Sequence, residues 1–293
     1  MSSQIGFIGL GRMGLPMAEN LVRAGFRVVG FDMSEAARAA FLEKGGEVGG
    51  TVAEVAGEAD LLVTMLPNGQ IVRSALLDEP GFALGLRPGS VVIDMSSSAP
   101  TQTASLAEAL SPRGVTLIDA PVSGGVAKAV DGTLAILVGG EADAVERVRP
   151  VLGAMGASII HTGATGSAHC MKALNNFVSA AGLVAVSEAL HVGARFGLKP
   201  ETIVEALNAS TGRNNTTERK ALPFMVSEAY NSGFAMNLMA KDIGIAADLA
   251  ADLGLDMAEL ALMARLWREA SQVLGPDADH TAMHRFVGEK AGG

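Results

Sequence analysis

A lysine that could transfer a proton stands close to two asparagines in the second half of the chain. Lys172, Asn175 and Asn176 are spaced i, i+3 and i+4, which places them on one face of a helix. Apolar neighbours such as Ala173 and Phe177 would desolvate the lysine, lower its pKa and make it a proton donor and acceptor near neutral pH. The asparagines could orient the lysine or bind a hydroxyl or carboxylate. The same spacing also fits a solvated helix face, where lysines are common.

A glycine motif near the N-terminus has the pattern of a dinucleotide site. Residues 9–14 read G-x-G-x-x-G after an apolar run and before a helix-like segment. The first glycine permits a tight turn, the second lets a pyrophosphate approach the backbone, and the third lets the helix pack closely on the strand. Unpaired N–H groups at the helix start favour the anion. The predicted cofactor-binding residues are therefore Gly9, Leu10, Gly11, Arg12, Met13 and Gly14, with an ordinary glycine-rich turn as the alternative.

One acidic residue bears on which dinucleotide is bound. Asp32 ends the second strand-like run, where an acid would accept hydrogen bonds from the adenosine ribose. A carboxylate repels a 2′-phosphate, and Met33 and Ser34 follow it instead of an arginine. The residue favours NAD over NADP, with Arg38 as the reservation. Its alternative role is to cap the following helix.

Further loops follow strand-like runs. Leu66-Pro67-Asn68 and Ser96-Ser97-Ser98 follow the third and fourth runs, and parallel sheets bind ligands at such carboxyl ends. After the fifth run, Ser123, Gly124 and Gly125 could expose backbone N–H groups to a carboxylate. Each of these loops could also be an ordinary turn.

The elements that must hold these residues alternate in the first half of the chain. Strand-like runs are separated by helix-length segments such as 16–24 and 36–43, which indicates βαβ units and a mainly parallel sheet. The runs lie at 5–10, 27–31, 61–65, 91–95, 116–118, 134–138 and 159–160.

The second half has helical periodicity throughout. Residues 167–196 predict one long helix, and further helices are expected at 200–209, 238–253 and 257–273, with no strand after residue 160. The fold class is thus an α/β Rossmann-type N-terminal domain plus an all-α C-terminal domain joined by a long helix. The expected bounds are 1–163 for the NAD-binding domain, 164–196 for the interdomain helix and 197–293 for the helical domain.

Composition limits the partners. Hydrophobic residues make up 49% of 293 residues, and the formal net charge is −9, which disfavours nucleic acid and anionic membranes as partners. A lone Cys170 and scattered histidines give no metal-binding spacing, so no metal is expected. Polar residues interrupt the long helix, so no membrane span is expected. His169 is expected to be partly exposed. Cytoplasmic localisation follows as the expectation.

Four segments together resemble the β-hydroxyacid dehydrogenase family, which includes 3-hydroxyisobutyrate dehydrogenase, tartronate semialdehyde reductase and threonate dehydrogenase. They are residues 5–25 (IGFIGLGRMGLPMAENLVRAG), 119–125 (DAPVSGG), 163–176 (GATGSAHCMKALNN) and 238–242 (LMAKD). The resemblance implies an NAD(P)-dependent oxidoreductase with its active site between two domains. It also implies a homodimer or homotetramer.

The same resemblance implies roles for single residues. Lys172 would be the general acid and base, Asn176 would position the substrate, and Ser123, Gly124 and Gly125 would bind its carboxylate. Leu66, Pro67, Ser97 and Lys241 would contact the cofactor. Hydride would pass between nicotinamide and a small 3-hydroxy acid or its semialdehyde, such as 3-hydroxyisobutyrate, glycerate or tartronate semialdehyde, or a threonate-like compound.

Some residues leave the substrate open. Lys128 is more typical of the semialdehyde reductase and threonate branches, and Ile71 replaces an asparagine found in many relatives. Arg213 and Asn214 could recognise a polar substrate tail or could be surface residues. Two other functions stay open: a non-catalytic NAD-binding or interaction protein, and an imine- or other carbonyl-reducing relative. Retention of Lys172 argues against both.

Overall fold

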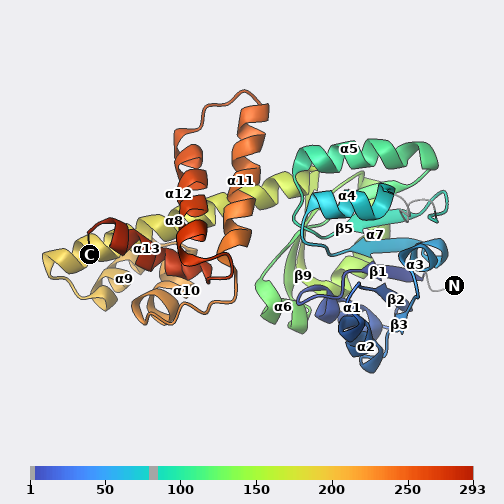
Figure 1. Ribbon diagram of the computed structural model, residues 1–293, viewed down its shortest axis with the longest axis horizontal. Helices are drawn as coiled ribbons and strands as arrows, with labels where there is room; N and C mark the ends of the chain where they lie inside the picture. Colours follow the sequence, from blue (N-terminus) through green and yellow to red (C-terminus); the bar gives the residue numbers. More distant parts are fainter. Residues whose placement is uncertain (1–3, 79–84, 293) are drawn as a thin grey trace. The chain divides into compact units, whose positions relative to one another are not determined.

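A computed structural model describes residues 4–78 and 85–292, and its first half is built on a sheet. In the described residues this sheet has nine strands in the order β3-β2-β1-β4-β5-β6-β8-β7, with β9 beside β8 (Figure 1). The strands are β1 (Ile5–Ile8), β2 (Val28–Phe31), β3 (Glu47–Val48), β4 (Leu61–Thr64), β5 (Val91–Asp94), β6 (Thr116–Asp119), β7 (Val122–Ser123), β8 (Leu134–Gly139) and β9 (Gly156–Gly163).

Helices cover both faces of the sheet, which is why its central strands are apolar except at their carboxyl ends, where Thr64 and Asp94 stand. All residues of β1, β4 and β5 are buried. One face packs on α1 (Gly14–Arg23), α2 (Glu35–Glu43), α6 (Gly125–Asp131) and α7 (Ala142–Met155). The other face packs on α3 (Val52–Glu58), α4 (Gly69–Leu77) and α5 (Pro100–Leu110).

The strand order reverses between β1 and β4, the position where doubly wound sheets bind ligands. Strands β1 to β6 pair in parallel, as the alternating pattern predicts. The far edge differs, because β8 runs antiparallel to β6 and β7. The two-residue strands β3 and β7 were not anticipated, and β9 extends well beyond the predicted residues 159–160.

The second half of the chain is helical. It contains α8 (Ser167–Phe196), α9 (Pro200–Asn208), α10 (Asn215–Arg219), α11 (Met236–Asp252), α12 (Ala258–Leu274) and α13 (Met283–Lys290). A π-helical turn, Ala221–Val226, follows α10. The chain divides into two compact units within α8, between Lys172 and Ala173. No strand follows Gly163 in the described part, where the β contact is one bridge between Ala235 and Asp279.

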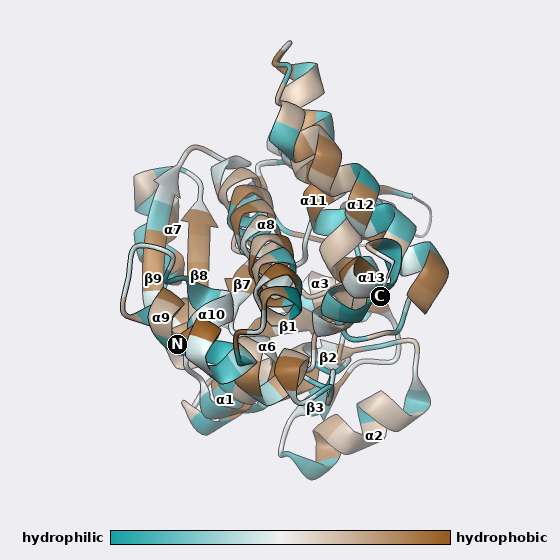
Figure 2. Ribbon diagram, turned by 90° about the vertical axis from the view of Figure 1, so that its left-hand side faces the viewer, coloured by the Kyte–Doolittle hydropathy of each residue, from teal (hydrophilic) through white to brown (hydrophobic). Residues whose placement is uncertain are grey.

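The helix α8 has the length and mean hydropathy of a membrane span, although the sequence analysis ruled such a span out. Hydrophobic and hydrophilic residues alternate along it (Figure 2). Its residues Ala180, Leu183 and Val186 lie in a core with Met239 and Trp267. One face of α8 therefore contributes to the core of the helical unit.

Candidate active site

The three motif glycines differ in what a side chain would meet at each position. Gly9 has a φ of +99°, and a Cβ there would overlap the carbonyl oxygen of Met65. A Cβ on Gly14, the first residue of α1, would overlap the carbonyl oxygen of Gly9. A Cβ on Gly11 would meet nothing within 4 Å. Packing therefore explains Gly9 and Gly14, whereas open space beside Gly11 fits a cradle for the pyrophosphate of a dinucleotide.

The carboxylate of Asp32 is tied to this turn. Its Oδ2 accepts a hydrogen bond of 2.7 Å from the backbone N–H of Leu10, and its Oδ1 accepts one of 2.8 Å from Ser34. Arg38 donates to the carbonyl oxygens of Asp32 and Met33, and its guanidinium lies 5.7 Å from the ring centre of Phe31. The arginine is thus engaged at the end of β2, next to the acid that the sequence assigns to the ribose.

The loops after β4 and β5 are locked to each other. The Ser96 hydroxyl accepts a hydrogen bond of 2.9 Å from the backbone N–H of Leu66. Asp94 accepts hydrogen bonds from Thr64 and Ser98, both at 2.9 Å. These bonds fix the segments that contain the predicted cofactor contacts, and the side chains of those contacts, Leu66, Pro67 and Ser97, are not buried.

The predicted carboxylate-binding turn lies between β7 and α6. Gly124 has a φ of +136° and Gly125 a φ of +71°, values that other residues rarely adopt. A Cβ on Gly125 would meet nothing within 4 Å, and both glycines are exposed. Together with Ser123 at the end of β7, the turn presents backbone in a form suited to an anion.

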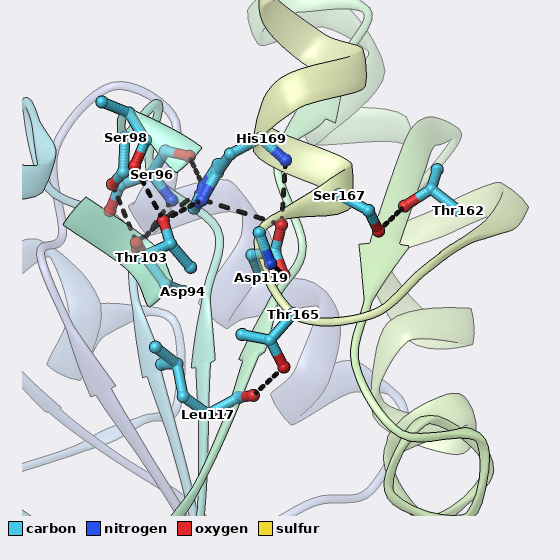
Figure 3. A network of polar contacts seen from close by, with 12 residues as sticks. Asp94, Ser96, Ser98, Thr103, Leu117, Asp119, Thr162, Thr165, Ser167 and His169 are labelled. Carbon is cyan, nitrogen blue, oxygen red and sulfur yellow. Dashed lines mark hydrogen bonds and ion pairs between the residues drawn. The ribbon is translucent and has the colours of Figure 1, made fainter. Parts of the chain in front are cut away.

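A buried histidine connects the carboxyl ends of β5 and β6 and the helix α5 to the start of α8 (Figure 3). The Nε2 of His169 lies 3.0 Å from the carbonyl oxygen of Ser96, and its Nδ1 lies 2.7 Å from the Thr103 hydroxyl. Asp119 accepts hydrogen bonds from the backbone N–H groups of Gly166 and His169, at 2.7 and 2.9 Å. His169 is only 1% exposed. The expectation of a partly exposed His169 is therefore wrong.

The predicted proton-transfer lysine and the predicted substrate-positioning asparagine are buried on α8. Lys172 is 9% exposed and Asn176, one turn later, is 6% exposed. The Asn176 amide donates a hydrogen bond of 2.6 Å to Oδ2 of Asp242, and Asn175 donates one of 3.1 Å to Asn176. These two bonds orient the Asn176 amide.

Asp242 is a residue that the sequence analysis did not assign. It is 3% exposed, and the Lys241 ammonium lies 3.3 Å from its Oδ1. That contact is an ion pair without hydrogen-bond alignment, since the same Oδ1 has no hydrogen-bond partner. The sequence contains a signal for this residue, because Asp242 is the last residue of the LMAKD segment. Its hydrogen bond with the Asn176 amide, 66 residues away, cannot be seen in the sequence.

The two residues considered for a polar substrate tail have other contacts. Asn214 caps α10 by accepting from the backbone N–H groups of Thr216 and Thr217. Arg213 is largely exposed and lies 3.6 Å from Glu218. No group of three or more metal-ligating side chains occurs in the part of the chain that the structure describes.

Comparison with known families agrees with this architecture. The sequence profile of the NAD binding domain of 6-phosphogluconate dehydrogenase matches residues 4–163. A second profile, NAD-binding of NADP-dependent 3-hydroxyisobutyrate dehydrogenase, matches residues 166–287. The two matches meet close to the start of α8.

Individual relatives agree with the profiles. A 2-(hydroxymethyl)glutarate dehydrogenase of Eubacterium barkeri is 40% identical over 84% of this chain and 81% of its own length. An NAD-dependent L-serine dehydrogenase of Pseudomonas aeruginosa is 37% identical over 84% of this chain and 85% of its own. The structure of Mycobacterium tuberculosis 3-hydroxyisobutyrate dehydrogenase with L-serine has a TM-score of 0.91 and 33% identity, covering 98% of this chain and 99% of that one.

These matches define a dehydrogenase with an NAD-binding domain and a helical second domain. The chain belongs to the β-hydroxyacid dehydrogenase family. The predicted fold class, enzyme class and NAD cofactor are confirmed. An imine reductase of Myxococcus stipitatus shares only 18% identity at a TM-score of 0.67, which is a likeness of fold alone.

Proposed function

We propose that this enzyme transfers hydride between NAD and the hydroxyl-bearing carbon of a small 3-hydroxy acid, with Lys172 as general acid and base. The observation that supports the proposal is the pair Lys172 and Asn176, both buried one turn apart on α8, with the Asn176 amide oriented by Asp242. Burying a lysine amine costs free energy, and a purely structural helix gains nothing from it. A lysine that transfers protons to and from a substrate does need this partly desolvated position.

The cofactor is proposed to lie at the carboxyl ends of β1 and β4. The backbone of residues 9–14 would hold its pyrophosphate, and Asp32 would accept from the adenosine ribose and repel a 2′-phosphate. Leu66, Pro67, Ser97 and Lys241 stay predicted cofactor contacts. These residues would hold NAD, which would supply the hydride acceptor for the oxidation.

The residues of the chain then handle the proton and the carboxylate. In the oxidation, neutral Lys172 accepts the hydroxyl proton while the carbon–oxygen single bond becomes a carbonyl. In the reduction, its ammonium returns that proton to the carbonyl oxygen. Asn176 positions the hydroxyl, and the turn of Ser123, Gly124 and Gly125 binds the carboxylate. Alignment of the reacting atoms is the main contribution of the protein.

The names of the relatives indicate a substrate class. 3-Hydroxyisobutyrate, L-serine and 2-(hydroxymethyl)glutarate all contain the unit HOCH2–CH(R)–COO⁻, where R is a methyl, an ammonium or a carboxyethyl group. The turn of residues 123–125 and Lys172 would recognise the shared carboxylate and hydroxyl. We propose a substrate with this unit; glycerate and threonate remain candidates from the sequence.

The test is an initial-rate assay of NADH absorbance with purified protein. NAD or NADP is supplied with 3-hydroxyisobutyrate, L-serine, 2-(hydroxymethyl)glutarate, glycerate or threonate. We expect turnover of at least one HOCH2–CH(R)–COO⁻ compound, faster with NAD than with NADP. Absence of turnover throughout, while NADH still binds, would favour the non-catalytic NAD-binding alternative.

We also propose that the enzyme is a cytoplasmic homodimer or homotetramer. The lone cysteine suits a reducing compartment. Exposed apolar side chains follow one another along α8, with Val178 68%, Val192 71% and Phe196 84% exposed. Such a row is typical of an interface between subunits. Light scattering coupled to size-exclusion chromatography measures the subunit number, and a monomer would contradict this part of the proposal.

A further inference from the structure

A partly buried cation lies in the helical unit, away from ion-pairing carboxylates. Lys220 sits between α10 and the π-helical turn, and its ammonium lies 3.4 Å from the hydroxyl of Ser179 on α8. Burial lowers the pKa of Lys220, and the Asp279 carboxylate offsets part of that lowering. Within residues 4–78 and 85–292, lysines such as Lys44, Lys241 and Lys290 form ion pairs with carboxylates, and Lys220 is not among the lysines that do. A desolvated cation in this state gains from an added anion.

The nearby Asp279 is committed to other donors. It accepts hydrogen bonds from the hydroxyls of Ser232 and Thr281 and from the backbone N–H groups of Gly233 and Thr281, at 2.5 to 3.1 Å. These bonds hold the loop before α11 against the turn before α13. The adjacent His280 has its pKa lowered by burial, and Lys220 contributes to that lowering. Asp279 therefore acts as a structural acceptor, and Lys220 keeps its capacity for an anion.

The position of Ser179 relates Lys220 to the proposed reaction site. Ser179 follows Asn176 by three residues and Lys172 by seven, so all three side chains project from one stripe of α8. Along the helix axis, Ser179 lies about 4.5 Å beyond Asn176, since each residue rises about 1.5 Å. The Asp242 carboxylate on this face is already engaged by Asn176 and Lys241.

We propose that Lys220 and Ser179 form a second anion subsite, which binds a carboxylate on the C2 substituent of the substrate. This inference rests on the proposed function and deepens it, because it makes the substrate a dicarboxylic 3-hydroxy acid. The ammonium would pair with the distal carboxylate, and the Ser179 hydroxyl would donate to it. A substrate whose C2 substituent is an ammonium would be repelled.

Two measurements test the subsite, and the first needs no turnover. Isothermal titration of the NADH-loaded protein compares glutarate, which has two carboxylates, with butyrate, which has one. The second measurement compares kcat/KM for 2-(hydroxymethyl)glutarate and 3-hydroxyisobutyrate, which differ only in the C2 substituent. Both are made on the wild type and on Lys220→Met, Lys220→Arg and Lys199→Met; Lys199 is an exposed lysine of the same unit and serves as the matched control.

The expected contrast follows from the loss of one charge-assisted contact. Lys220→Met should lose roughly 10- to 100-fold in affinity for glutarate and in kcat/KM for 2-(hydroxymethyl)glutarate, mainly through KM. The affinity for butyrate and the kcat/KM for 3-hydroxyisobutyrate should change by no more than about twofold, because neither molecule has a second carboxylate to contact Lys220. Lys220→Arg should recover part of the loss, and Lys199→Met should match the wild type. A thermal melt of each variant checks folding, and Lys220→Arg decides the matter if the Met variant is unstable.

The outcomes separate the two proposals. Equal losses for the one- and two-carboxylate ligands, or no loss for either, would overturn the subsite while turnover of 3-hydroxyisobutyrate leaves the proposed function standing. A glutarate contrast that depends on Lys220, in a protein that oxidises none of the five hydroxy acids of the panel, would support the anion site and overturn the proposed reaction.

Discussion

Gly11→Ala should weaken cofactor binding and leave the fold intact. The new methyl group would meet no protein atom within 4 Å, and Gly11 does not have a positive φ. The free energy of unfolding should therefore change by no more than about 0.5 kcal/mol. The methyl group would, however, occupy the space through which a pyrophosphate reaches the backbone. Loss of one or two charge-assisted contacts corresponds to roughly 10- to 100-fold weaker NADH binding.

Gly14→Ala is the matched variant, with the same chemical change three residues later. Its methyl group would overlap the carbonyl oxygen of Gly9 and lie 3.2 Å from the Phe7 ring. Because that oxygen is backbone, α1 or the turn must move, and we expect a loss of about 2–3 kcal/mol in unfolding free energy. At about 2–4 °C per kcal/mol, the Tm should fall by roughly 4–12 °C.

Urea unfolding and NADH fluorescence titration on the same three proteins measure both quantities. The reasoning requires the two variants to differ in kind: Gly11→Ala loses affinity at unchanged stability, and Gly14→Ala loses stability. Wild-type NADH affinity in Gly11→Ala would refute the assignment of this turn to the pyrophosphate. A wild-type free energy of unfolding in Gly14→Ala would refute the packing argument.

Three further predictions concern single residues. Asp32→Asn should lower the ratio of kcat/KM for NAD over NADP by roughly tenfold or more, because the charge that repels the 2′-phosphate is lost; an unchanged ratio would remove Asp32 from this role. His169→Gln should cost about 2–3 kcal/mol in urea unfolding, since the buried partners Ser96 and Thr103 lose their ring contacts; a wild-type midpoint would contradict this. Burial, with a smaller effect of His191, lowers the pKa of His284 to about 4. As the pH falls, the unfolded state therefore takes up a proton at this histidine before the folded state does. The free energy of unfolding should fall by about 1–2 kcal/mol from pH 7 to pH 4, after allowance for partial solvent screening. His284→Phe, which keeps the ring stacked on His191, should flatten that slope in urea unfolding at both pH values, and a slope equal to that of the wild type would show another group responsible.

The parts of the fold that local patterns determine were predictable. The apolar runs of β1, β4 and β5 are separated by helix-length segments, and such runs need cover on both faces. The roles of Gly9 and Gly14 follow from geometry that any turn between a strand and a helix imposes. The edge strand β7 has two residues, too few for a periodicity to detect.

The polar contacts of the site were not predictable in the same way. His169 is buried because Ser96, Thr103 and Asp119, which lie 50 to 73 residues earlier in the chain, surround its ring and backbone. The bond from Asn176 to Asp242 spans 66 residues, and the contact of Lys220 with Ser179 spans 41. Such pairs depend on how whole elements pack. A single sequence gives no local signal for them, and Lys220 was missed for this reason while Arg213 and Asn214 were considered.

The most direct test of the account is the turnover of Lys172→Met compared with its NADH affinity. The measurement is NADH formation from the hydroxy acid that the wild type oxidises best, with NADH binding followed by fluorescence on the same protein. The account predicts a loss of kcat by at least roughly 100-fold, the lower end of what general acid–base catalysis supplies, with NADH affinity unchanged within about threefold. Turnover close to that of the wild type would contradict the assignment of Lys172 as the proton-transfer residue.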